Sequence, residues 1–114
     1  MFFVSFWQTM TSPKMSPAER HKSRVASLGC VICRRLGFQP AIPAEVHHVA
    51  EGSGLRSDFA VAGLCPEHHR GKSGLHGMGT KRFCSMYRLP GECEYGVLVL
   101  VNEDLARYGA RVVW

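Results

Sequence analysis

Residues 44–69 have the sequence AEVHHVAEGSGLRSDFAVAGLCPEHH, and the fold prediction rests on the order of the elements in this segment. Ala44–Val49 has strand character, and Phe59–Leu64 is a short apolar run bounded by turn signals, which also predicts a strand. The polar, glycine-containing segment 51–58 between them predicts a loop. Pro66 predicts a helix start, because proline suits the first helical position. The segment therefore predicts a small α+β fold with two strands, a loop between them and a short helix.

Two pairs of metal-binding residue types flank the predicted strands. Cys30 and Cys33 have two residues between them, as do Cys65 and His68. Together the four residues predict a Cys3His site for a structural zinc ion, and the alternative is two unrelated pairs of buried side chains. A zinc site would also compensate for the small core that 114 residues can bury, because metal binding contributes to folding.

The other histidines of this region predict a second metal site. Consecutive strand residues point to opposite faces, so His47 and His48 cannot easily share one site. His69 lies about 100° around the helix from its neighbour, and is expected to face the strand pair. His76, about two helical turns further on, could return to that face. One residue of the His-His pair, with His69 and His76, would form a three-imidazole site with open positions for substrate. The alternative is that each is an ordinary surface or core histidine.

Three further residues are candidates for smaller roles. Asp58 could orient a histidine or join the metal shell, and the alternative is a carboxylate that caps a turn. Cys84 and Cys93 have no partner at ligand spacing, so Cys84 is predicted to lie in the core and Cys93 in a loop.

Helices are predicted on both sides of the central segment. Ser16 and Glu19 match a capping box around Pro17, which predicts a helix start, and Gly29 predicts its end. The predicted parts are an N-terminal tail over 1–15, a single domain over 16–114, and within it helices over 18–28, 80–88 and most of 97–108. Residues 97–101 have strand composition as well, and periodicity does not separate the two possibilities.

The charge is concentrated near the start of the chain. The 14 Lys and Arg residues outnumber the nine acids, and residues 1–40 hold the whole net charge of +5. A basic face favours nucleic acid as a partner, and the alternative is a solvated surface that only aids solubility. The five cysteines are an odd number, and the apolar opening Met1–Met10 lacks the features of a secretory signal and is too short to cross a membrane. These features favour a reduced, cytoplasmic protein that does not contact membranes.

A strand with an HH pair, a loop, a second strand and a short helix with a metal histidine resembles the ββα-metal (HNH, His-Me finger) nucleases. The runs 44–54, 63–71 (GLCPEHHRG), 74–83 (GLHGMGTKRF) and 93–105 are similar to the recombination enhancement function (Ref) nucleases of temperate phages. The resemblance implies a zinc-stabilised HNH domain with flanking helices. It implies a DNA endonuclease that hydrolyses phosphodiester bonds where a RecA filament is present, in the cytoplasm of a bacterial host.

The resemblance also implies roles for individual residues. His47, His69 and His76 would bind the catalytic metal (Mg2+ or Mn2+, or Zn2+ in the protein as isolated), and His48 would be the general base. Asp58 is the nearest substitute for the central asparagine of HNH motifs, which has no counterpart here. The basic residues expected to contact DNA are Arg20, Lys22, Arg24, Arg34, Arg35, Arg70 and Lys72.

A second function fits the same residues. The chain could be a non-catalytic, zinc-stabilised module that binds nucleic acid, with the extra histidines in structural roles. A second metal held by four protein ligands would favour the module, whereas three ligands and a water would favour the enzyme.

Overall fold

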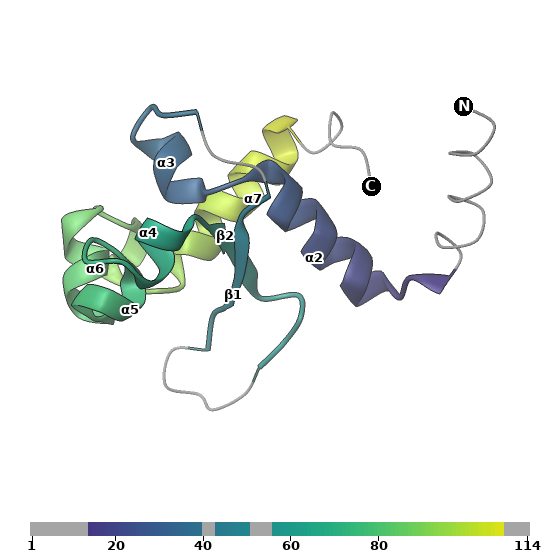
Figure 1. Cartoon of the computed structure of the whole chain (residues 1–114), viewed down its shortest axis with the longest axis horizontal. Helices are drawn as coiled ribbons and strands as arrows, with labels where there is room; N and C mark the ends of the chain where they lie inside the picture. The colour runs from purple at the N-terminus through teal and green to yellow at the C-terminus, as the bar shows by residue number, and fades with distance from the viewer. Residues whose placement is uncertain (1–13, 40–42, 51–55, 109–114) are drawn as a thin grey trace.

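The computed structural model describes residues 14–39, 43–50 and 56–108 (Figure 1). Residues 1–13 of the predicted tail, residues 51–55 of the loop predicted over 51–58, and residues 109–114 lie outside the described residues. The elements are helices α2 (Pro17–Leu28) and α3 (Val31–Arg35), strands β1 (Glu45–His48) and β2 (Val61–Leu64), helices α4 (Pro66–Arg70), α5 (Leu75–Met78) and α6 (Thr80–Met86), the 3-10 helix η2 (Pro90–Glu92), and α7 (Gly96–Tyr108).

Helix α2 begins where the capping box predicts. The Ser16 hydroxyl accepts the Glu19 N–H at 3.1 Å, and the Glu19 carboxylate accepts the Ser16 N–H at 2.9 Å, so two N–H groups that have no partner within the helix are satisfied. Gly29 ends the helix with a φ of 87°, a backbone conformation that favours glycine. The predicted start and end of this helix are confirmed.

The two strands form an antiparallel hairpin that is slightly shorter than predicted. Glu45 pairs with Leu64, and His48 pairs with Val61. All four residues of β2 are buried, whereas in β1 only His47 is buried. Gly63 allows the close approach of α2, because a Cβ there would lie 2.7 Å from the Gly29 carbonyl oxygen.

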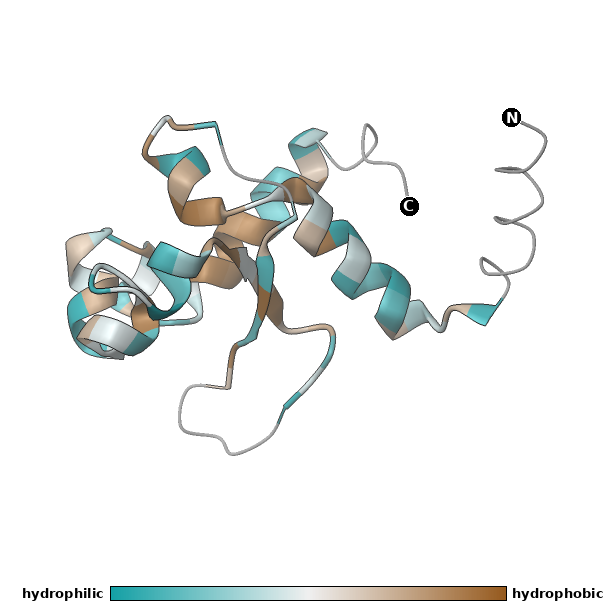
Figure 2. Cartoon of the chain, viewed as in Figure 1, coloured by the Kyte–Doolittle hydropathy of each residue, from teal (hydrophilic) through white to brown (hydrophobic). Residues whose placement is uncertain are grey.

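The core lies where the hairpin meets α2, α3 and α7. Helices α2 and α7 both pack against β2 (Figure 1). Figure 2 shows hydrophobic residues gathered along α3, β2 and the buried part of α7, and hydrophilic residues along α2. Val97, Leu100 and Val101 are the buried side chains of α7. Helix α7 includes residues 97–108, which confirms the prediction of a helix there. The strand-like composition of 97–101 reflects the burial of apolar side chains on one face of this helix.

Residues 66–86 form three short helices, where sequence analysis predicts two. Helix α4 ends at Arg70, and a turn over residues 71–74 leads to α5, which is followed directly by α6. The prediction of a short helix after Pro66 is confirmed, and so is a helix over most of 80–88. Within the described residues, no helix is both long and apolar enough to span a membrane.

Candidate active site and metal centres

Cys30, Cys33, Cys65 and His68 come together in one cluster, as their spacing predicts, and these four could hold a metal such as zinc. The Sγ atoms of Cys33 and Cys65 are 3.8 Å apart. The Nδ1 atom of His68 is 3.3 to 3.5 Å from the three sulfurs. Ligands of a tetrahedral zinc ion would be separated by about 3.8 Å for two sulfurs and about 3.5 Å for a sulfur and a nitrogen. These four distances therefore match those expected between the ligands of a zinc ion.

Two helix starts build this cluster. Cys30 precedes α3 as its N-cap, and its sulfur accepts the Cys33 N–H at 3.4 Å. Cys65 precedes α4, and His68 lies on the buried side of that helix. The Cys30–Cys33 segment is thus the first part of a helix.

Burial affects the pKa of Cys30, Cys33 and His68 in this cluster. Burial lowers the pKa of His68, which favours the neutral imidazole that a metal needs. Burial is also the largest cause that raises the pKa of Cys33 to about 12, and it raises the pKa of Cys30. In the metal-free protein these are thiols, so zinc binding would release protons from them.

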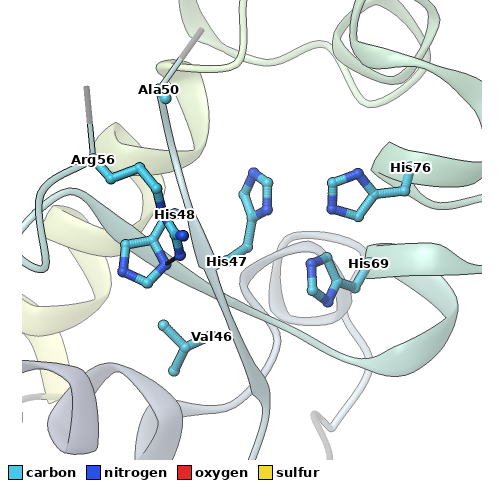
Figure 3. A pocket seen from close by; sticks show the side chains of 7 residues that line it. All are labelled: Val46, His47, His48, Ala50, Arg56, His69 and His76. Atoms are coloured by element: carbon cyan, nitrogen blue, oxygen red, sulfur yellow. Dashed lines mark hydrogen bonds between the residues drawn. The ribbon is translucent and has the colours of Figure 1, made fainter. Parts of the chain in front are cut away.

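His47, His69 and His76 form a second cluster, and each offers one ring nitrogen within 4.8 Å of the others. The ring centroids of His47 lie 5.2 Å from those of His69 and His76, and the latter two are 4.8 Å apart. Figure 3 shows the three imidazoles turned toward one another. Burial, and then the charges of His69 and His47, lower the pKa of His76, which favours its neutral form. These three could hold a second metal ion.

The reason given for the meeting of His69 and His76 is wrong, although they do meet. They do not lie two turns apart on one helix, because α4 ends at Arg70 and α5 begins at Leu75. The turn between the two helices brings α5 back beside α4. The prediction that His69 faces the strand pair is confirmed by its contact with His47 on β1.

His48 lies on the other side of β1, as the alternation of a strand predicts (Figure 3). Its Nε2 is 2.9 Å from a carboxylate oxygen of Asp58, and its Nδ1 is 2.9 Å from Nη2 of Arg56. A guanidinium only donates, so Nδ1 accepts from Arg56 and Nε2–H donates to Asp58. This hydrogen bond from His48, and then the charge of Lys22, lower the pKa of Asp58. Asp58 therefore contacts His48 and not the three-histidine cluster.

Two carboxylates that sequence analysis does not single out touch the histidine cluster. Glu94 Oε2 is 2.6 Å from His47 Nε2, and both side chains are buried. Glu45 Oε1 is 2.8 Å from His69 Nδ1. Glu45 and His47 are two residues apart on β1, so the alternation of a strand would have placed both side chains on one face. No local pattern in the sequence identifies Glu94.

An open cavity of about 330 Å³ adjoins both histidine groups. Its lining includes His47, His69 and His76 on one side of β1 and His48 with Arg56 on the other (Figure 3). The three-histidine cluster and His48 therefore border the same cavity.

The residues expected to contact DNA differ in how they are engaged. Arg34 donates to the Leu28 carbonyl and lies 3.3 Å from Asp104. Arg35 donates to the carbonyls of Tyr87 and Arg88, and Arg20 donates to the carbonyl of Met15. Arg70 pairs with the Glu45 carboxylate, and Lys22 pairs with that of Asp58. Arg20 and Lys72 are exposed, and Arg24 is partly buried.

Cys84 is buried, as predicted, and Cys93 lies in the segment between η2 and α7.

Comparison with known proteins gives one match. The family described as recombination enhancement, RecA-dependent nuclease matches residues 16–105. No curated protein and no solved structure gives a significant match. The matched segment runs from the cap of α2 almost to the end of α7 and includes every residue of both clusters. The chain belongs to the family of recombination-enhancement, RecA-dependent nucleases.

Proposed function

We propose that this protein is a metal-dependent DNA endonuclease of the HNH (His-Me finger) type that hydrolyses phosphodiester bonds in DNA held by a RecA filament. The observation that carries the proposal is the pairing of two groups across one strand. The three-imidazole cluster lies on one side of β1, and His48, hydrogen-bonded to Asp58, lies on the other. Both border the same cavity.

One divalent metal (Mg2+ or Mn2+, or Zn2+ in the protein as isolated) would be held by His47, His69 and His76. When bound, it would supply Lewis-acid stabilisation of the phosphate and of the leaving oxygen. The cluster has three ligands among the described residues, which leaves coordination positions for water and substrate. The Cys30, Cys33, Cys65 and His68 cluster would hold the structural zinc.

His48 would act as the general base. In this role its Nδ1 takes a proton from water, the water oxygen attacks phosphorus, and the bond to the leaving oxygen breaks. Asp58 would hold the ring in the tautomer with Nε2–H, which leaves the lone pair on Nδ1. Arg56, which donates to Nδ1 in the absence of substrate, would have to leave, and a phosphate anion is a stronger partner for a guanidinium than a neutral imidazole.

DNA would be contacted by the basic residues named above. Those with exposed side chains, such as Arg20 and Lys72, are better suited to bind phosphates than Arg34, which is held by Asp104. Dependence on RecA is inferred from the description of the family. The resemblance to the Ref nucleases of temperate phages suggests a phage or prophage origin and a bacterial cytoplasm as the location.

A nicking assay tests the proposal. The wild-type protein, with Mg2+ or Mn2+, is expected to cut an oligonucleotide strongly in the presence of RecA and ATP, and weakly in their absence. His48→Ala should lower the cleavage rate about 10²–10⁴-fold with little effect on DNA affinity, because phosphate binding does not need the base. The matched control is His21→Ala on α2, where the ring contacts Phe59 outside the site. Equal rates for the wild type and His48→Ala would contradict the assignment of the base.

The alternative is a non-catalytic zinc module that binds nucleic acid. It would be supported if the wild type bound DNA and retained zinc but cut no substrate under any of these conditions. Among the residues that the structure describes, the second cluster has three ligands, which favours the enzyme, since a purely structural zinc would need a fourth.

A further inference from the structure

Glu94 is an acidic residue buried against the histidine cluster. It lies between η2 and α7, and its side chain is 9% exposed beside that of His47, which is 8% exposed. Its carbonyl accepts the Val97 N–H at 3.1 Å at the start of α7. Gly96 packs tightly in the same segment, because a Cβ there would lie 2.6 Å from the Pro90 carbonyl oxygen. The backbone therefore holds Glu94 in a fixed position.

The contact with His47 is short and specific. Glu94 Oε2 lies 2.6 Å from His47 Nε2, which is slightly shorter than a typical charge-assisted N–H···O hydrogen bond. When the carboxylate accepts the Nε2–H, the lone pair of the imidazole is on Nδ1. A buried carboxylate destabilises a small domain unless it has such partners, so a residue that only filled space would be better apolar.

The same arrangement recurs at His69 with the opposite ring nitrogen. Glu45 lies 2.8 Å from Nδ1 of His69, and Arg70 holds this carboxylate at 2.7 Å. That leaves Nε2 of His69 for the cluster. Two of the three imidazoles thus have a carboxylate on one ring nitrogen and the other nitrogen free to bind a metal.

We propose that Glu94 is a positioning residue that fixes the tautomer and orientation of His47, so that His47 binds the metal through Nδ1 while His69 binds through Nε2. The inference rests on the proposed function, because it requires that the three histidines hold a metal. It assigns Glu94 no contact with substrate.

A pair of variants of nearly equal size separates positioning from packing. Glu94→Met removes the hydrogen-bond acceptor and keeps a flexible side chain of similar length, whereas Glu94→Gln keeps an acceptor for the Nε2–H. The matched control is Glu103→Met, since Glu103 is an exposed acid of α7. Each protein is first loaded with zinc at the cysteine site. The histidine tautomers are then assigned by 15N NMR, and Co2+ is titrated in afterwards.

The expected result is a loss of about 10–100-fold in Co2+ affinity for Glu94→Met, the range typical of partners that orient metal ligands. The His47 ring should also lose its single Nε2–H tautomer. Glu94→Gln should retain the tautomer and most of the affinity, and Glu103→Met should match the wild type. Equal affinity and an unchanged tautomer in Glu94→Met would overturn the inference while the proposed function stood. Failure of the wild type to bind Co2+ at the three histidines would overturn the proposed function itself.

Discussion

Arg70 illustrates how one contact changes the interpretation of a basic residue. Sequence analysis places it among the DNA contacts, but in the structure its Nη2 lies 2.7 Å and its Nε 3.1 Å from the Glu45 carboxylate. The Arg70 hydrogen bonds are the largest cause, and the His69 hydrogen bond the second, of a Glu45 pKa lowered to about 2. Glu45 is therefore ionised at working pH and accepts the Nδ1–H of His69. Arg70 therefore contacts the three-histidine cluster indirectly, through Glu45.

Replacement of Arg70 should raise the pKa of Glu45. In Arg70→Ala the largest cause of the lowered pKa is gone, so the carboxylate should titrate closer to its ordinary value. Because the pKa of Glu45 is lowered, its ionised carboxylate stabilises the fold at any pH above the ordinary pKa of a glutamate. This contribution is lost as the pH falls toward about 2. Carboxyl 13C NMR between about pH 6 and about pH 4 should show little titration of Glu45 in the wild type and a clear inflection in the variant. Arg82→Ala, at an exposed position of α6, is the control and should match the wild type. A flat Glu45 signal in Arg70→Ala would contradict this account.

At the residue scale, the sequence predicts the ligand types but not their neighbours. The spacing of Cys30 and Cys33 identifies half of the Cys3His cluster, because two residues between them allow both side chains to lie together. No comparable signal identifies Glu94, which is distant from His47 in the chain and reaches it only because α7 packs on the hairpin. Contacts of this kind depend on tertiary packing, which local patterns do not encode.

At the element scale, the geometry of the three-histidine cluster depends on how α4 and α5 fold against each other. His69 lies on α4 and His76 on α5, with the turn over 71–74 between them. Gly77 on α5 faces the end of α4 so closely that a Cβ there would overlap the Gly71 carbonyl oxygen. The position of His76 relative to His69 therefore depends on the absence of a side chain at residue 77.

Gly77→Ala should displace α5 and weaken the histidine cluster. Overpacking of this kind typically costs about 1–3 kcal/mol of unfolding free energy. The displacement should also lower the affinity of the zinc-loaded protein for Co2+ at the three histidines. Gly37→Ala is the control, because its φ of +88° makes alanine unfavourable while its Cβ would meet nothing within 4 Å. Both variants should melt earlier in thermal unfolding, but only Gly77→Ala should lose Co2+ affinity. Full affinity in Gly77→Ala would show that α5 tolerates the methyl group.

Elements with strong end signals are predicted well, and those that depend on glycine turns are not. The Ser16 capping box predicts where α2 begins, and Gly29 predicts its last residue correctly. Both signals act through backbone groups within one turn of the helix end. The short helices α3 and α5 are missed. A five-residue helix has too few residues for a periodic pattern, and several close glycines are compatible with many turns.

At the scale of the whole molecule, the two clusters are linked through α4. His68 faces the cysteine cluster and His69, its neighbour, faces the three-histidine cluster. The cysteine cluster in turn joins the start of α3 to the start of α4. A metal there would fix α4 against the part of the chain before the hairpin. Loss of a zinc ion bound at this cluster is therefore expected to disrupt the proposed active site as well as the fold.

Cys33→Ala and Cys93→Ala test this linkage with the same substitution at two partly exposed cysteines. Binding at a structural zinc site is worth about 10–16 kcal/mol in zinc-finger peptides, which is comparable to the whole stability of a small domain of about 5–15 kcal/mol. Cys33→Ala should therefore lose tightly held zinc, unfold or aggregate, and fail to bind Co2+ at the histidines. Cys93→Ala, outside both clusters, should keep one equivalent of zinc, wild-type melting and Co2+ binding. Zinc content by metal analysis, thermal melting and Co2+ titration provide the three measurements. A Cys33→Ala protein with unchanged melting and a full equivalent of tightly held zinc would show that the fold does not depend on this site.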